Sequence, residues 1–165
     1  MTSRGAEPLP RAVAWLGYGG LLPFVALAAA SVAADLSGQY SGANPQPWNA
    51  ALLAYGAAIL SFVGALHWGF AMTLGGMNPV QRSASFVWSV VPALVAWLAL
   101  LTPPMAATAL LVAGFCLHYA QDCRLAAHAD LPGWYLPMRL RLTAVTCLCL
   151  CVGVIAALLQ PLPGA

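Results

Sequence analysis

Long apolar runs alternate with short polar stretches along the whole chain. Five runs approach or exceed the roughly 20 residues that a helix needs to cross a hydrocarbon core about 30 Å thick. They cover residues 12–34, 49–74, 84–101, 105–121 and 140–159. The stretches between them are rich in Gly, Pro, Ser and Asn or carry charge, as turns and loops do. The pattern predicts a single integral membrane domain over residues 1–165.

The predicted spans must be helical, because the bilayer core offers no water to satisfy exposed backbone groups. The alternation typical of a membrane β-barrel is absent. Composition agrees: 62% of the residues are hydrophobic and 6% are charged, whereas about a quarter of the residues of a soluble domain are charged. The fold class is therefore all-α, a polytopic membrane bundle of five transmembrane helices.

The positive charges fix an expected orientation. All six are arginines, since the chain has no lysine. With five spans they all fall on one side of the membrane: Arg4, Arg11, Arg82, Arg124, Arg139 and Arg141. The positive-inside rule then places the N-terminus inside and the C-terminus outside. This predicts a bacterial inner-membrane protein, or a mitochondrial inner-membrane protein if the source is eukaryotic.

The first apolar run could also be part of a cleaved secretory signal. Arg4, Arg11 and the "AAASVAAD" ending of the first run also resemble a secretory signal. That run exceeds the usual 7 to 15 or so apolar residues of a signal, so we expect it to be kept as a span.

The net charge of +2 is small and dispersed, which argues against a nucleic-acid surface.

The "CLCLC" run, residues 147–151, resembles a metal motif. Alternate positions on a helix are turned by about 200°, so Cys149 faces away from Cys147 and Cys151. Three ligands cannot converge from that spacing. We expect packed or lipid-facing thiols and predict no metal site.

His67 lies in "GALHWGF", inside the second run. On a helix its face also holds Gly56, Leu60, Gly64 and Ala71. Small residues at this spacing let membrane helices approach closely. His67 is therefore expected to face another helix and not lipid.

His118 in the fourth run has a similar face, with Ala107, Leu111 and Gly114, and Asp122 follows one turn later. The second and fourth spans run in the same direction, with both histidines in their inner halves. We therefore expect His67 to meet His118 or Asp122, with Tyr55 and Tyr119 as further candidate partners.

Ionisable residues inside a membrane suggest function, and several roles remain open for His67, His118 and Asp122. A histidine can simply hydrogen-bond the next helix, which contributes on the order of 0.6 kcal/mol. The three residues could instead bind a small molecule such as a quinone, or the two histidines could ligate haem. A proton relay through His118 and Asp122 is a further alternative.

The segment "HADLPGWYLPMRLRLT", residues 128–143, is the main polar stretch. Trp134 and Tyr135 are expected in the headgroup region as anchors. Arg139 and Arg141 are expected to reach lipid phosphates or to pair with acidic residues, namely Asp122 and Asp130.

Two stretches, "YGAAILSFVGALHWGFA" (55–71) and "GWYLPMRLRLT" (133–143), together with Asp122 between them, resemble the transmembrane protein 69 family, also called domain of unknown function 3429. The resemblance extends over nearly the whole chain from Leu16. It implies a small multi-pass inner-membrane protein and brings no established activity. No catalytic residue follows from it.

No nucleophile with its base, carboxylate pair, phosphate-binding loop or complete zinc ligand set is evident in the sequence. We therefore predict a non-enzymatic membrane protein without a required cofactor, acting as an accessory or assembly component of a membrane complex. The alternative is a small-molecule or cofactor-binding protein that uses His67, His118 and Asp122. The expected partners are the lipid bilayer and a membrane protein, and the oligomeric state is left open.

Overall fold

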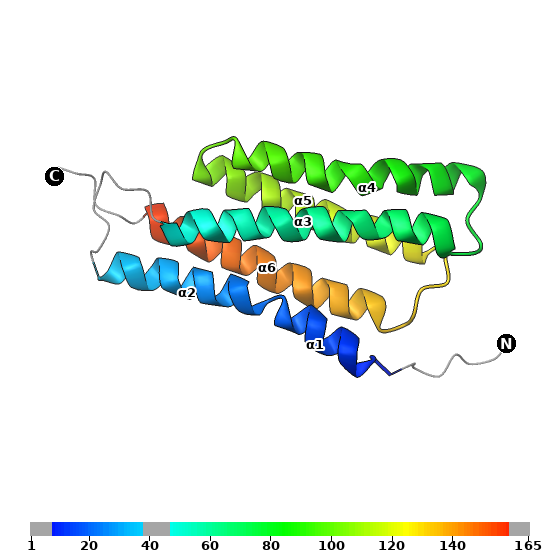
Figure 1. Cartoon of the computed structure of the whole chain (residues 1–165), viewed down its shortest axis with the longest axis horizontal. Helices are drawn as coiled ribbons and strands as arrows, with labels where there is room; N and C mark the ends of the chain where they lie inside the picture. Colours follow the sequence, from blue (N-terminus) through cyan, green and yellow to red (C-terminus); the bar gives the residue numbers. More distant parts are fainter. Residues whose placement is uncertain (1–7, 38–46, 159–165) are drawn as a thin grey trace.

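The computed structural model describes residues 8–37 and 47–158, and their regular structure is entirely α-helical. The helices are α1 (Arg11–Gly19), α2 (Leu22–Leu36), α3 (Pro47–Thr73), α4 (Pro79–Leu100), α5 (Pro104–Ala126) and α6 (Tyr135–Leu158). They lie side by side along one long axis (Figure 1). If α1 and α2 are taken together as one segment, consecutive segments alternate in direction. The predicted all-α bundle is confirmed.

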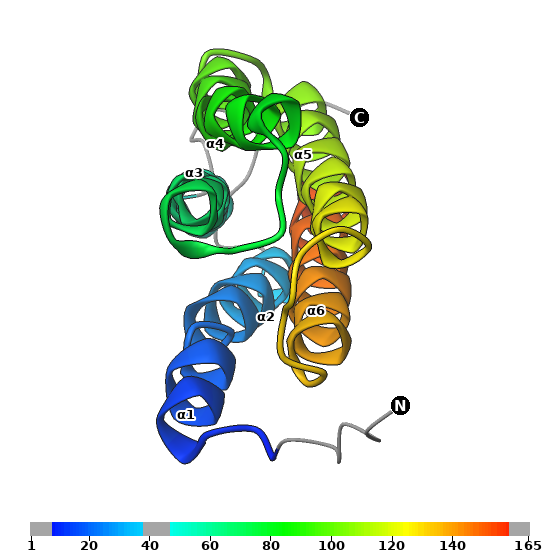
Figure 2. The same cartoon turned by 90° about the vertical axis from the view of Figure 1, so that its right-hand side faces the viewer.

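The first predicted span, 12–34, is not one straight helix but the bent pair α1 and α2. Pro23 has no N–H to donate to the carbonyl of Gly19, so the helix is interrupted there. The Tyr55 hydroxyl of α3 donates to the neighbouring carbonyl of Gly20 at 2.9 Å. Beyond this bend α1 leans away from the other helices (Figure 2), and none of its residues is buried.

Four helical segments of the described chain are long and apolar enough to cross a membrane: Arg11–Leu36, Pro47–Thr73, Pro79–Leu100 and Tyr135–Ala156. The fifth, α5, is of similar length but carries His118, Asp122 and Arg124, which lower its hydropathy. It nevertheless packs against α3, α4 and α6. Five crossings therefore remain a prediction for this transmembrane protein.

Three helix ends differ from the predicted bounds by five residues. The third predicted span begins at residue 84, but α4 begins at Pro79. The fourth span was expected to end at residue 121, but α5 continues to Ala126. The fifth was expected to begin at residue 140, but α6 begins at Tyr135. Pro137 is tolerated because it lies in the first turn of α6, where a backbone N–H has no partner within the helix. Asp122 and Arg139 are therefore helical residues, not loop residues.

The small-residue faces predicted for the two histidines are confirmed. Gly56, Leu60, Gly64 and Ala71 are buried with His67 on α3. Ala107, Leu111 and Gly114 are buried with His118 on α5. The core of the bundle includes five large apolar side chains less than 2% exposed, namely Phe24, Leu52, Leu60, Leu111 and Leu150.

The described arginines lie in the first or last two turns of α1, α4, α5 and α6, and these helix ends lie together at one end of the bundle (Figure 1). Arg4 lies outside the described residues.

We expect a reporter inserted near Gly76 to be active inside and one fused after Ala165 to be active outside, because arginines are retained inside. Activity of both reporters on the same side would contradict five crossings.

Candidate functional site

His67 and His118 meet inside the bundle, as the sequence predicted. α3 and α5 run in the same direction (Figure 1), and the two imidazole centroids are 5.0 Å apart. Both side chains and that of Asp122 are completely buried. The close approach of the two helices is possible because Gly114 of α5 faces Leu60 of α3.

The Asp122 carboxylate is the centre of this cluster. Its Oδ1 lies 3.0 Å from His67 Nε2 and accepts a hydrogen bond from the Tyr135 hydroxyl at 3.1 Å. Its Oδ2 accepts from Arg139 Nε at 2.8 Å. Since a carboxylate only accepts, His67 donates through Nε2. Three helices therefore meet at one buried carboxylate, and Asp122, His67, Tyr135 and Arg139 are called the Asp122 cluster below.

His118 is oriented by a different partner. Trp88 of α4 lies 3.1 Å from His118 Nδ1 through its indole nitrogen. An indole N–H can only donate, so Nδ1 carries the lone pair and Nε2 carries the proton of the neutral ring. That Nε2 lies 3.8 Å from Asp122 Oδ1, too far for a hydrogen bond. His118 therefore stands beside the Asp122 cluster without joining it.

The charges within the Asp122 cluster balance. Asp122 and Arg139 carry opposite charges in contact, and His67 can remain neutral while it donates. Three buried nitrogens, however, find no hydrogen-bond partner among the described residues: His67 Nδ1, His118 Nε2 and Arg139 Nη2. Buried polar groups in folded proteins usually have a protein or water partner.

The ligand atoms of His67, His118 and Asp122 lie within 4.8 Å of one another, so the three could supply a partial metal-ligand set. Asp122 is already engaged by two neutral donors and a guanidinium, which disfavours a second cation there. Haem fits worse, because a macrocycle would have to lie between two rings that Asp122 already approaches at 3.0 and 3.8 Å. A role for the three residues in cofactor binding stays a prediction.

The sequence anticipated only part of the Asp122 cluster. The pairing of Arg139 with Asp122, one of two alternatives, is confirmed. Tyr135, expected in the headgroup region, is buried within the bundle and donates to Asp122, and its depth in the membrane stays a prediction. Arg141 donates to the Tyr18 hydroxyl at 3.3 Å. The missed signal was the i, i+4 spacing of Tyr135 and Arg139, which places both on one helix face.

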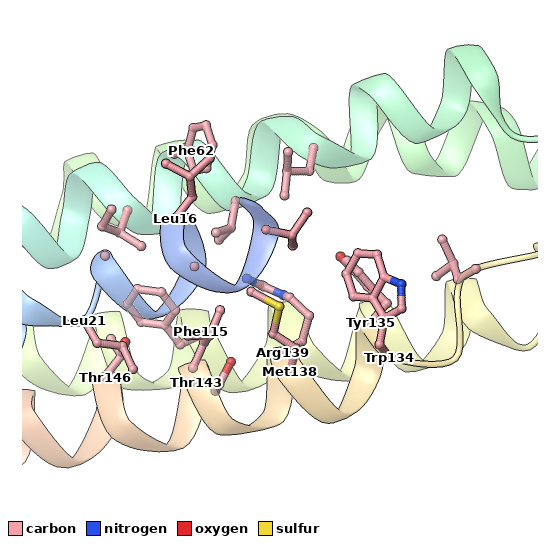
Figure 3. Close-up of a pocket in the computed structure, with 18 of the residues that line it drawn as sticks. Leu16, Leu21, Phe62, Phe115, Trp134, Tyr135, Met138, Arg139, Thr143 and Thr146 are labelled. Atoms are coloured by element: carbon pink, nitrogen blue, oxygen red, sulfur yellow. The ribbon is translucent and has the colours of Figure 1, made fainter. Parts of the chain in front are cut away.

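A cavity of about 490 Å³ adjoins the Asp122 cluster, between α1–α2, α3 and α6 (Figure 3). Its walls are almost wholly apolar, with Phe115 of α5 among them. Leu16 and Phe62 line it and are 79% and 64% exposed. Since these two residues belong to α1 and α3, the cavity opens at the bundle surface between those helices.

The polar groups of the cavity come mainly from one face of α6. Tyr135, Arg139 and Thr143 are spaced one turn apart, and Thr146 continues the row (Figure 3). Arg139 thus belongs to both features: its Nε holds Asp122, and its guanidinium lines the cavity. Neither His67 nor His118 lines it.

Comparison with known proteins relates this chain to a family of membrane proteins. The model of a protein family of unknown function, DUF3429, matches residues 9–155. Transmembrane protein 69 of Xenopus tropicalis is 35% identical over 151 residues, which cover 86% of this chain and 53% of that protein. The chain thus spans about half the length of the curated relative it matches. No solved structure matches. The match over nearly all the described helices shows that the chain belongs to the transmembrane protein 69 (DUF3429) family.

Proposed function

We propose that this protein binds a lipophilic small molecule, which enters the cavity sideways from the bilayer. The observation that carries the proposal is the cavity itself. Its volume of about 490 Å³ lies in the range of small-molecule sites, and such sites combine apolar walls with a few placed polar groups. The row of polar residues on α6 supplies those groups.

The position of the cavity supports entry from lipid. One wall is α1, which has no buried residue and is separated from α2 by the bend at Gly20. The opening is flanked by Leu16 and Phe62, whose exposed apolar side chains suit acyl chains and not water. An apolar molecule dissolved in the membrane can therefore reach the cavity without crossing an aqueous phase.

Binding without catalysis is the role proposed, in the inner membrane that the sequence predicts. Ser61 donates its hydroxyl to the carbonyl of Ala57 at 2.8 Å, and no base among the described residues accepts it instead. The groups of the Asp122 cluster mainly hold one another. The accessory or assembly role in a membrane complex stays a prediction.

Filling the cavity should abolish binding. We expect Leu66→Trp to remove a molecule that co-purifies with the wild-type protein, because Leu66 lines the cavity and the larger indole would occupy it. The measurement is mass spectrometry of solvent extracts from protein purified in mild detergent.

Leu94→Trp is the matched control, because Leu94 is 54% exposed on α4 and does not line the cavity. It should retain the molecule. Equal extracts from both variants, or no specific molecule in the wild type, would contradict the proposed function.

A further inference from the structure

The Arg139 guanidinium is the charged donor among the described residues that line the cavity. Arg139 is 7% exposed, and its Nη2 is buried with no hydrogen-bond partner among the described residues. The residue lines the cavity and its guanidinium lies among the lining side chains (Figure 3). A hydrogen bond donated by a charged group in apolar surroundings is among the stronger ones, so a ligand that supplies an acceptor to the guanidinium is favoured.

The charge of the site selects the kind of acceptor. The positive charge of Arg139 is already balanced by Asp122, 2.8 Å from its Nε. A carboxylate or phosphate in the cavity would add a second negative charge that no described lining residue compensates, at a large cost in a medium of low dielectric constant. A neutral carbonyl oxygen accepts the same hydrogen bond and leaves the charge balance unchanged.

The side chains that line the cavity favour a particular shape for the polar end of the ligand. Six aromatic side chains line the cavity: Phe24, Phe62, Phe70, Phe115, Trp134 and Tyr135. Aromatic side chains favour stacked or edge-to-face contacts with a flat ring. The exposed opening at Leu16 and Phe62 leaves room for an apolar tail to extend into lipid.

We infer that the molecule bound is of the quinone class: a flat ring with a neutral carbonyl oxygen that accepts a hydrogen bond from the Arg139 guanidinium, on an apolar tail. This inference rests on the proposed function. It differs from the histidine-centred site expected from the sequence, because the donor is an arginine on α6 and His67 acts only through Asp122, which holds that arginine in place.

The test is calorimetric titration of the full chain in detergent with four probes. They are a decyl-tailed benzoquinone, decylbenzene, decanoate and dioctanoylglycerol, which represent a ring with carbonyls, a ring alone, an anion and carbonyls without a ring. We expect the quinone to bind most tightly. Asp122→Asn combined with Arg139→Gln, which keeps the site neutral, should weaken quinone binding about tenfold or more and leave decylbenzene binding unchanged.

Two further variants keep the test decisive. Arg139→Lys retains the charge beside Asp122 but lacks the planar guanidinium that can donate to Asp122 and to the ligand at the same time, so it should also weaken quinone binding even if the double variant does not fold. Arg124→Gln is the control, because Arg124 is an exposed arginine on α5, and it should bind the quinone as the wild type does.

The outcomes separate the inference from the proposed function. Tighter binding of decanoate or of dioctanoylglycerol, or a quinone affinity that does not depend on Arg139, would overturn the quinone inference and leave the binding cavity in place. If no probe binds the wild type and Leu66→Trp changes nothing, the proposed function itself fails.

Discussion

Replacing Asp122 with Ala should destabilise the protein by about 3–5 kcal/mol, because it leaves the buried Arg139 guanidinium without its counter-charge. The same change removes the acceptor of His67 and of the Tyr135 hydroxyl. Three helices would lose their common contact. The measurement is the free energy of reversible unfolding in detergent, with circular dichroism as the probe of helix content.

Charge balance can be separated from the loss of hydrogen bonds. Asp122→Asn combined with Arg139→Gln removes both charges together and should be clearly less damaging than Asp122→Ala alone. A double variant that is as unstable as Asp122→Ala would show that the ion pair is not what stabilises this region.

The coupling of His67 to Asp122 is measured in the same experiment. His67→Leu should cost about 1 kcal/mol, the loss of one hydrogen bond, since Tyr135 and Arg139 still hold the carboxylate. Combined with Asp122→Ala, the effects should fall short of additivity by roughly 0.5 kcal/mol or more. Strict additivity would refute the contact between the two side chains.

Adding one methyl group at Gly64 should also be harmful. A Cβ there would lie 2.8 Å from both Cβ and Cγ of Pro92 on α4, and a proline ring cannot rotate out of the way. Gly64→Ala should therefore force α3 and α4 apart and cost about 1–3 kcal/mol. Thermal unfolding in detergent measures the effect.

Gly69 provides the matched control on the same helix. A Cβ at Gly69 would meet no atom within 4 Å. Gly69→Ala should be neutral or stabilise by up to about 1 kcal/mol, because alanine favours helix. If Gly64→Ala were as stable as Gly69→Ala, close packing of α3 on α4 would be disproved.

The membrane-bundle architecture could be predicted from the sequence because lipid imposes it. Apolar length and the need to satisfy the backbone predict helices without any knowledge of their packing. The same holds for the buried face of His67, since the glycines beside it favour helix contact. The bend at Gly20 was missed because hydropathy continues through Pro23, although the proline that interrupts the helix stands in the sequence. Only the tertiary structure brings Tyr55 of α3 to this bend.

The meeting of His67 and His118 followed from direction and depth along the spans, which the sequence by itself determined. Which groups surround Asp122 was decided only by the tertiary structure. Tyr135 and Arg139 lie beyond the apolar run that marks the fifth span, and hydropathy does not report that the helix extends over them. The cavity likewise results from how α1–α2, α3 and α6 diverge. That divergence depends on side-chain packing between segments distant in the chain, to which a local pattern of apolar and polar residues is insensitive.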